Sequence, residues 1–292
     1  MQTKNAKCLF GIIAIGFYLL CIIACASAAD VPQSASQPVW PALSSAQYYW
    51  YEPETNLTVE QADVVFKEVT ASEISMLMSR YPKKPCIVKS VQVMIGKSKK
   101  GKKVTDGSLK LGNIWEGYSE PYPMDVALNT IQKMDLYYVS KAKNKWLLSI
   151  SAVDDSYELF FKDEDSARKF GNAVASILAQ EGFTLKLSKI GLFTTDLTPE
   201  QAQALGKTRI DNVLVTLVAI DGPTDKAGIQ PLDVITEVNG VKVKNYSHFN
   251  TLIESITSGT KITLTCLRRT EIDDKGQKQS VWEPKVFEVM IK

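Results

Sequence analysis

The sequence predicts an α+β protein with two domains behind an N-terminal leader. Three observations support this architecture. An apolar run lies near the N-terminus, strand patterns in the central region lead into an amphipathic helix, and the C-terminal third carries a series of glycine-containing motifs. We expect residues 1–29 to form the leader, 30–47 a tether, 48–184 the first domain and 187–292 the second.

The composition is that of a folded chain without a strong charge. Hydrophobic residues make up 45% of the 292 residues and charged residues 23%, which indicates globular domains rather than disorder. Of the 34 lysines and arginines, Lys4 and Lys7 lie in the leader, so the rest of the chain has 32 basic and 32 acidic residues. A neutral protein gives no electrostatic reason to expect a nucleic acid partner.

The first thirty residues have the pattern of a secretory signal. Lys4 and Lys7 precede an unbroken apolar run from Cys8 to Ala24, and small residues follow at 26–29. The alternative is a membrane anchor that stays attached, although the run is slightly short for a span. The protein is therefore expected to be exported from the cytoplasm.

The end of the apolar run resembles the bacterial lipobox, in which a cysteine becomes the lipidated first residue of the mature protein. Residues 22–25 read Ile-Ile-Ala-Cys, so Cys25 is the expected lipidation site. The segment 26–45 is rich in Ala, Ser, Pro and Gln, like a tether between a membrane and a domain. Plain cleavage after Ala28 or Ala29 is the alternative. We expect a lipoprotein of the bacterial periplasm, held at the membrane by a lipid anchor or a retained leader.

Cysteine usage indicates neither disulfides nor metal binding. Three of the five cysteines lie in the leader, and only Cys86 and Cys266 remain, one in each predicted domain. Two thiols so placed form neither a disulfide framework nor a metal site. Both are expected to be small buried residues, and the sequence predicts no metal and no cofactor.

The first domain is predicted to consist mostly of antiparallel strands. Residues 136–139, 146–152 and 157–161 read as successive strands, and a helix with Asp163 or Asp165 as its N-cap follows them. The apolar positions of this helix recur at helical spacing, at Ala167, Phe170, Val174, Ile177 and Leu178. Antiparallel strands closed by a C-terminal helix resemble a pleckstrin-homology-like domain, a resemblance that rests on the order of the elements.

An aromatic run precedes this domain at residues 48–51, Tyr-Tyr-Trp-Tyr. If exposed, it would form an interaction patch. We expect it instead to pack as the first strand or arm of a domain.

The C-terminal third carries motifs in a fixed order. They are Lys-Ile-Gly-Leu at 189–192, Leu-Thr-Pro-Glu at 197–200, Ala-Leu-Gly at 204–206, Val-Leu-Val at 213–215, Gly-Pro-Thr-Asp-Lys-Ala-Gly-Ile at 222–229, Pro-Leu-Asp-Val-Ile at 231–235 and Val-Asn-Gly at 238–240. With a helix near 247–258, they resemble the PDZ domains of the HtrA family of bacterial periplasmic proteases. The resemblance implies a β-sandwich or partial barrel with two helices. Leu232 stands where the family usually has glycine, which leaves the backbone geometry of that turn in doubt.

The resemblance implies a peptide-binding groove between one strand and one helix. A ligand C-terminus adds to the strand edge, and backbone N–H groups bind its carboxylate. Carried over by position, Ile190 and Leu192 line the pocket for the last ligand side chain, and Gly191 lets the loop amides converge. Phe193 and Thr194 continue the receiving strand. The alternative is that these are ordinary strand residues in a module that has lost binding.

On the predicted helix, His248, Leu252 and Ser255 lie along the rim of the core face, whose inner positions are Phe249, Ile253 and Ile256. In class I PDZ domains, a histidine at the first turn hydrogen-bonds a Ser or Thr two residues before the ligand's end. The alternative is an exposed histidine at the start of a helix with no role in binding.

The catalytic motifs of related proteases do not occur in this sequence. The sole histidine is His248, in the predicted PDZ helix, and neither Gly-x-Ser-Gly-Gly nor His-Glu-x-x-His is present. The Ser-x-x-Lys pairs at Ser166–Lys169 and Ser140–Lys143 are interpreted as coincidence. We therefore expect a protein that is not an enzyme and that binds protein or peptide C-termini or extended segments, its first domain serving as a scaffold or second interaction surface. The alternatives are a regulatory or adaptor subunit of an envelope protease or secretion complex, and a cryptic Ser/Lys hydrolase.

The lipobox interpretation predicts that Cys25 is the first residue of the mature protein and carries two or three acyl chains. Intact mass spectrometry of protein purified from membranes measures this addition directly. A mature protein that begins unmodified at Ala29 or Asp30 would contradict the prediction.

Overall fold

The computed structural model describes two compact units. One spans residues 51–187, and the other combines residues 46–50 with residues 188–292. The first domain was expected to begin at residue 48, but Tyr48–Trp50 belong to the second unit, because their backbone binds Ile220 there. The described residues are 46–99, 102–105, 107–115, 122–274 and 277–292.

The leader, Cys25 and most of the predicted tether lie outside the described residues. Every helix among the residues that are described is too short or too polar to span a bilayer.

The first unit is built on one antiparallel sheet with strand order β8-β9-β10-β2-β3-β6-β7. Its strands are β2 (Ile74–Met78), β3 (Tyr81–Met94), β6 (Ser108–Trp115), β7 (Tyr122–Ala127), β8 (Ile131–Val139), β9 (Trp146–Ala152) and β10 (Ser156–Phe161). Between β3 and β6, the short strands β4 (Lys97–Lys99) and β5 (Lys102–Thr105) form their own pair. A 3-10 turn, η1 (Leu128–Thr130), separates β7 from β8.

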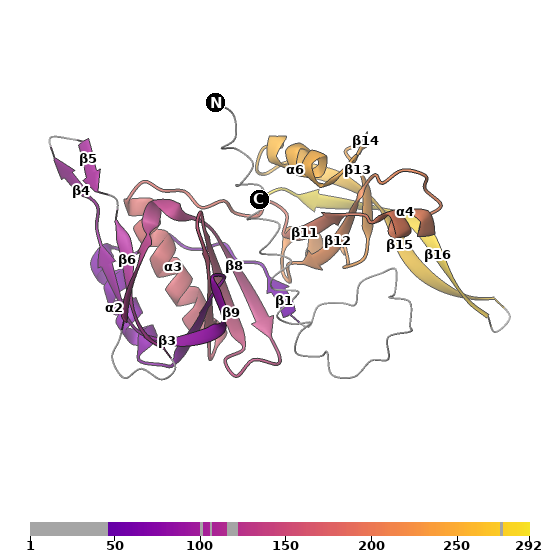
Figure 1. The fold of residues 1–292 in the computed structure, drawn as a ribbon. Coiled ribbons are helices and arrows are strands. Elements are labelled where there is room, and N and C mark those ends of the chain that lie inside the picture. Colours follow the sequence, from indigo (N-terminus) through magenta and orange to yellow (C-terminus); the bar gives the residue numbers. More distant parts are fainter. Residues whose placement is uncertain (1–45, 100–101, 106, 116–121, 275–276) are drawn as a thin grey trace, which may run out of the picture. The chain divides into compact units, whose positions relative to one another are not determined.

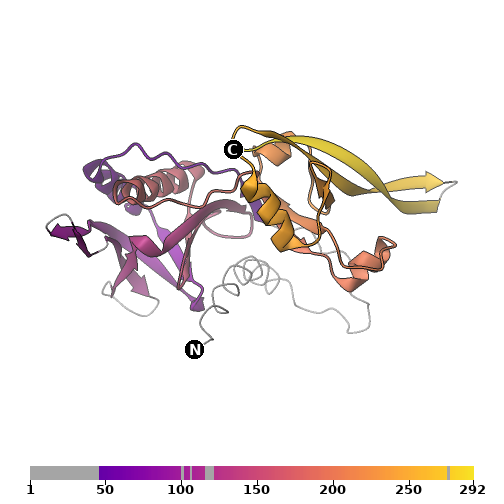
Figure 2. The same ribbon diagram turned by 90° about the horizontal axis from the view of Figure 1, so that it is seen from above.

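Two helices, α2 (Val59–Thr70) and α3 (Glu164–Gln180), lie side by side on this sheet, with α2 against β3 and α3 against β9 and β10 (Figures 1 and 2). The predicted cap of α3 is confirmed, since the Asp163 carboxylate accepts a hydrogen bond from the backbone N–H of Ser166 at 2.8 Å. All five predicted apolar positions of α3 are buried. The sequence analysis missed α2, although Thr58 and Gln61 form the capping box that starts it.

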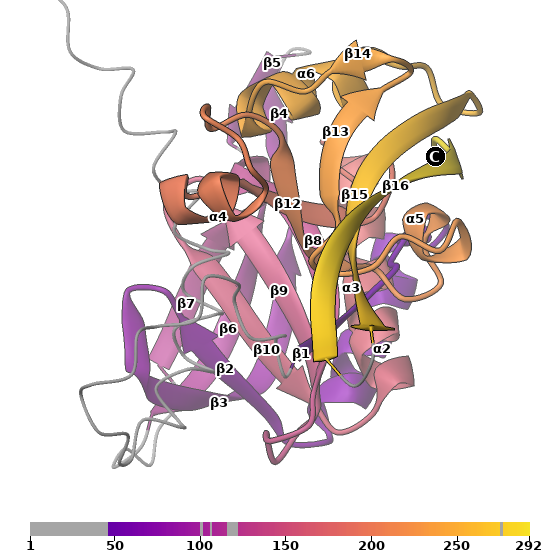
Figure 3. The same cartoon turned by 90° about the vertical axis from the view of Figure 1, so that its right-hand side faces the viewer.

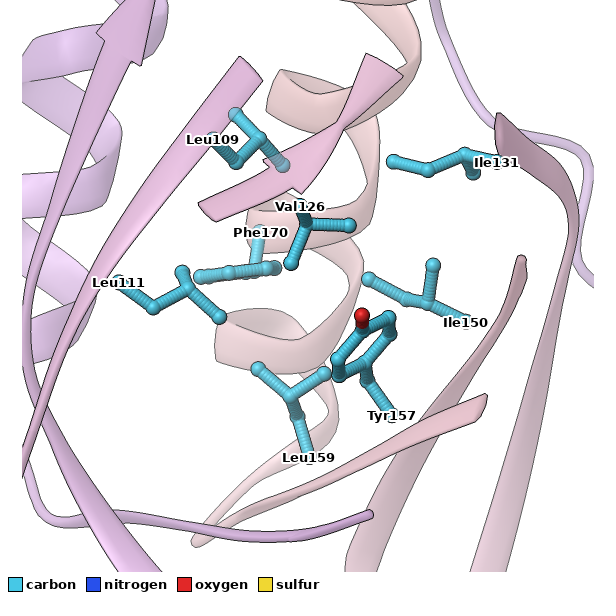
Figure 4. Close-up of a pocket in the computed structure, with 8 residues that line it drawn as sticks. All are labelled: Leu109, Leu111, Val126, Ile131, Ile150, Tyr157, Leu159 and Phe170. Carbon is cyan, nitrogen blue, oxygen red and sulfur yellow. The ribbon is translucent and has the colours of Figure 1, made fainter. Parts of the chain in front are cut away.

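The core of this unit lies between the sheet and α3. Leu109, Leu111, Val126 and Phe170 point toward one another from β6, β7 and α3 (Figure 4), around a cavity of about 10 Å³ with wholly apolar lining. A space of this size has room for about one water molecule, and an apolar lining offers that water no partner. This cavity is therefore too small for a ligand larger than water.

The order of strands and terminal helix agrees with the element order predicted for the first domain. The sheets of both units are antiparallel, so the α+β class is confirmed. The finer pleckstrin-homology-like assignment stays a prediction. Burial on β9 does not alternate strictly between the two faces, since Leu147 and Ser149 are buried as well as Leu148 and Ile150.

The second unit contains a sheet with strand order β11-β12-β13-β15-β16, and β14 pairs with β13 (Figure 3). Its strands are β11 (Leu192–Asp196), β12 (Val213–Val218), β13 (Val234–Val238), β14 (Val241–Lys242), β15 (Lys261–Asp274) and β16 (Gln277–Met290). The paired strands β15 and β16 extend well beyond the rest of the unit (Figure 2). The segment β1 (Ala46–Tyr49) also belongs to this unit, in which Tyr49 forms an isolated parallel bridge with Ile220.

Three helical segments complete the second unit: α4 (Pro199–Ala204), α5 (Pro223–Lys226) and α6 (Tyr246–Ser255). The prediction of two helices missed one of the two short segments. Both short helices begin with proline at their first turn, where the missing N–H costs no hydrogen bond. The main core packs α6 against the sheet through Phe249 and Ile253.

Both remaining cysteines are buried and free, as predicted. Cys86 is 2% exposed in the first unit and Cys266 is fully buried in the second. Burial raises the pKa of the Cys86 thiol to about 11 and that of Cys266 to about 12. Both side chains therefore stay neutral at physiological pH and act as small apolar residues.

Candidate functional site

The candidate site lies between strand β11 and helix α6, which contact each other in the second unit (Figure 1). We call it the β11–α6 site. Strand β11 pairs with β12 on one side only, and among the described residues no strand pairs with its other edge. That edge presents a row of backbone donors and acceptors to which an extended peptide can add.

The two outer strands of this sheet differ in their chemistry. Strand β16 contains Pro284 and alternating charges at Glu283, Lys285 and Glu288. Proline and lysine are the residues with which proteins protect an edge from unwanted pairing. Strand β11 reads Leu-Phe-Thr-Thr-Asp and carries neither proline nor lysine. The β11 edge is therefore the one whose sequence permits strand addition.

Helix α6 is fastened to the β11 segment at both ends. At its start, the backbone N–H of Tyr246 donates to the carboxylate of Asp196, the last residue of β11. At its end, the Lys189 ammonium donates to the carbonyls of Glu254 at 2.8 Å and Ile256 at 2.7 Å. An acid at the N-terminus and a base at the C-terminus each complement the helix dipole. These contacts fix the spacing between β11 and α6.

The loop before β11 is held by hydrogen bonds on both of its faces. Gly191 has φ +74°, the left-handed region in which only glycine avoids a side-chain penalty. Its N–H donates to the Ser188 hydroxyl at 2.8 Å, and its carbonyl accepts from the Ala219 N–H at 2.8 Å. A peptide carboxylate that binds the Gly191 amide must therefore take the place of the Ser188 hydroxyl.

Helix α5 supports the same loop through a buried hydrogen bond. Thr224 is fully buried, and its hydroxyl donates to the carbonyl of Ile190 at 2.8 Å. Sequence reasoning assigned no role to Ser188 or Thr224, because their partners depend on how distant segments fold together. The motif around Gly222 and Pro223 was visible, but its contact with the loop was not.

The predicted apolar pocket residues come together only in part. Leu192, Leu252 and Ile256 are each partly buried and pack against the main core. Ile190 is only 3% exposed and belongs to the core itself. Leu192, Leu252 and Ile256 are thus among the partly buried apolar residues around this core, and of these Ile256 was predicted as a core position.

The remaining predicted site residues occupy three different environments. The Phe193 side chain packs against Tyr48, with ring centroids 4.9 Å apart, so only its backbone can serve the open edge. Thr194 is 8% exposed. Ser255 is exposed, and its hydroxyl donates back to the carbonyl of Leu252 at 2.8 Å. Whether these residues bind peptide stays a prediction.

His248 is held in one orientation at the first turn of α6. Its Nδ1 accepts a hydrogen bond from the backbone N–H of Lys244 at 3.2 Å, and its own backbone N–H donates to the Asn245 side chain. Because Nδ1 acts as the acceptor, the neutral ring carries its hydrogen on Nε2. His248 can therefore offer a donor to a hydroxyl oxygen of a ligand.

The departure from the family pattern at Leu232 does not change the turn. Leu232 has φ +75°, so it adopts the left-handed conformation that the usual glycine would adopt. This conformation costs a residue with a side chain about 1–2 kcal/mol. The Leu232 side chain packs against a second apolar cluster around Leu214 and Val234, and this contact offsets the cost.

The two Ser-x-x-Lys pairs sit in ion-paired surface positions. Lys169 contacts Asp165 at 2.8 Å and Glu68 at 3.2 Å, and hydrogen bonds to these two acids raise the pKa of its ammonium. Lys143 contacts Glu73 at 3.1 Å. A lysine that serves as a general base needs a lowered pKa. The surroundings of Lys169 act in the opposite direction.

The glycine loop, the open strand edge and the flanking helix together define a PDZ domain. The model of the PDZ domain family matches residues 188–281, and this part of the chain is a PDZ domain of the HtrA type. The resemblance predicted from the sequence is confirmed.

Curated relatives match this region alone. The "Probable periplasmic serine endoprotease DegP-like" of Rickettsia conorii is 34% identical over 80 residues, which cover 27% of this chain and 16% of the relative. The "Periplasmic serine endoprotease DegP" of Escherichia coli K12 is 29% identical over 99 residues, or 33% and 21% of the two chains. The match thus spans about a fifth or less of these relatives' length.

A comparison of structures also finds an HtrA-type protein. The solved structure titled "HtrA-type protease AlgW with decapeptide" is 17% identical, with 85% of this chain and 71% of that chain covered. The TM-score is 0.27.

The contacts at the two ends of α6 generate a prediction on stability. Replacing Asp196 with alanine removes the acceptor at the N-terminus of α6 and should lower the free energy of unfolding by about 0.5–2 kcal/mol. Glu254→Gln removes the same charge near the C-terminus, where the dipole disfavours it, and should not destabilise the protein. Urea denaturation of both variants measures the difference. Equal destabilisation would contradict the assigned role of Asp196.

Proposed function

We propose that this protein is a non-catalytic, exported component of the cell envelope that binds the C-termini or extended segments of partner proteins. Binding takes place by strand addition to β11. The observation that carries the proposal is the edge of β11 beside α6, along which no strand of the described residues runs, in a domain that matches the PDZ family. The relatives' periplasmic names support the location.

The chemistry of the β11–α6 site suits a peptide with an apolar last residue. Leu192, Leu252 and Ile256 provide partly buried apolar surface, and Gly191 places its N–H at the end of the strand. His248 offers an Nε2 donor further along α6. A peptide laid along β11 would meet these groups in turn, with its carboxylate at the Gly191 end.

Two further parts of the proposal rest on the sequence. Anchoring through Cys25 follows from the lipobox resemblance, and the intact mass described above tests it. The absence of catalysis follows from the missing triad motifs, and the ion pairs of Lys169 support it. The alternative, an adaptor subunit of an envelope protease or secretion complex, would use the same edge for a fixed partner. The first unit, predicted to be pleckstrin-homology-like, would then serve as a scaffold or second interaction surface.

The first test of this function compares peptides that differ only at the terminus. A short peptide ending in Thr-Ala-Val with a free carboxylate should bind the protein lacking residues 1–29. Amidation removes the charge that the loop amide meets, so affinity should fall on the order of tenfold or more. Isothermal titration calorimetry measures both affinities.

Two variants locate the binding on β11 rather than elsewhere. Leu252→Ser places a polar group in the apolar surface and should lower the affinity for the peptide with a free carboxylate. Val286→Ser changes a residue that is 65% exposed on the opposite edge strand, β16, and should leave affinity unchanged. Equal binding of free and amidated peptides would exclude the carboxylate site.

The second test concerns His248. His248→Ala should weaken binding of a peptide ending in Thr-Ala-Val by about 0.5–1.5 kcal/mol, because the threonine hydroxyl of the peptide loses its hydrogen-bond donor. A peptide ending in Ala-Ala-Val has no hydroxyl at this position, so its affinity should not change. Thr251→Ala, on an exposed position of the same helix, is the matched control. An equal effect on both peptides would show that His248 acts through the helix and not through the ligand.

A further inference from the structure

The arm, Ala46–Trp50, is built into the PDZ unit although it precedes the whole first unit in the chain. The backbone N–H of Ile220 donates to the carbonyl of Tyr48 at 2.8 Å, and the N–H of Trp50 donates to the carbonyl of Ile220 at 2.9 Å. Tyr48 is 4% exposed and packs edge-to-face on Phe193 of β11. The arm is therefore held on this unit by its backbone and by the Tyr48 ring.

The indole of Trp50 lies against the backbone of two glycines. A Cβ added to Gly191 would stand 2.9 Å from Cε3 and 3.1 Å from Cζ3 of Trp50. A Cβ added to Gly222 would stand 3.2 Å from the same Cε3. Gly222 has ordinary backbone angles, so its lack of a side chain serves close approach and not conformation. At Gly222 the Ala219 carbonyl oxygen is nearer still, at 2.8 Å from an added Cβ, so Trp50 is one of two neighbours that crowd each glycine.

These two glycines belong to one hydrogen-bonded group around the loop. Ala219 connects them, because its N–H donates to the Gly191 carbonyl at 2.8 Å and its carbonyl accepts from the Gly222 N–H at 2.9 Å. Two residues after Gly222, the buried Thr224 binds the Ile190 carbonyl. The indole therefore lies against two members of the group that fixes the loop.

We propose that the arm is a positioning element of the peptide-binding site and that Trp50 is its positioning residue. The indole holds the Gly191 backbone in its left-handed conformation, with the N–H at the end of β11. Trp50 acts through Gly191 and does not itself contact the peptide. This inference rests on the proposed function, since it assigns Trp50 a role in carboxylate binding at the same site.

The same geometry changes how Gly191 variants must be interpreted. A valine at Gly191 would collide with Trp50 and with the Ala219 side chain, and it would also adopt an unfavourable φ. A loss of peptide affinity in Gly191→Val would therefore arise from the collision with Trp50 and Ala219 and not from a collision with the peptide. Trp50 is the better position for a test, because its substitution removes the support and leaves the loop sequence intact.

The test uses residues 30–292 with Trp50→Ala, the conservative Trp50→Phe and the exposed control Gln47→Ala. We expect Trp50→Ala to lower the affinity for the free-acid peptide ending in Thr-Ala-Val on the order of tenfold. The affinity for the amidated peptide should fall much less. The preference for the free acid should therefore shrink. Trp50→Phe should restore most of this preference, and Gln47→Ala should match the unmodified protein. An unchanged preference in Trp50→Ala would overturn the proposal.

A second measurement separates this inference from the proposed function. Amide hydrogen exchange of Ala219 and Thr224 reports on the loop without any peptide, because both N–H groups donate to loop carbonyls. Trp50→Ala should speed exchange at both amides and leave that of Val289 in the β15–β16 ladder unchanged. If the unmodified protein binds no peptide, the proposed function fails. If Trp50→Ala leaves exchange at the Ala219 and Thr224 amides unchanged, the positioning role of Trp50 is overturned. Faster exchange at all three amides would show a general loss of stability and would also overturn it.

Discussion

One edge of a β-sheet left without a partner is the constraint on which the second unit depends. Unpaired backbone groups are a liability in a folded protein, because they template pairing with any extended chain. The sheet has two such edges, and the sequence treats them differently. Pro284 and neighbouring charges protect β16, whereas β11 keeps a sequence that can pair. The elements around β11 keep this edge ordered when no peptide is bound to it.

Two kinds of interaction provide that order. The ends of α6 are bound by Asp196, the last residue of β11, and by Lys189, which precedes β11 in the chain. The helix therefore cannot move away from the edge without losing both contacts. The loop before β11 is fixed by buried hydrogen bonds and by the close packing of Trp50 on glycine backbone. A preordered edge and loop reduce the conformational entropy lost when an extended peptide binds.

How much of this could be predicted depended on the range of the interactions. The position of the loop, of β11 and of α6 followed from local motifs and from helical spacing at Phe249 and Ile253. The departure at Leu232 raised a question about backbone geometry that only the observed φ of +75° could answer. Helix α2 was missed although Thr58 and Gln61 carry its capping signal. The contact of Trp50 with Gly191 joins residues far apart in the sequence, and no local pattern encodes it.

The path of the chain explains why that contact was invisible. The aromatic run at 48–51 was expected to be an arm, but it divides between the units: Tyr48–Trp50 join the PDZ unit, and Tyr51 packs in the first unit against Gly171 of α3. The chain leaves the PDZ unit after Trp50 and returns at Ser188, and both residues contact Gly191. An inserted domain is tolerated where its two ends lie close together. Within the PDZ unit, the residue at which the chain leaves and the residue at which it returns both lie at the glycine loop, next to the start of β11. A fragment that begins at residue 187 therefore lacks one of the structures that order the site.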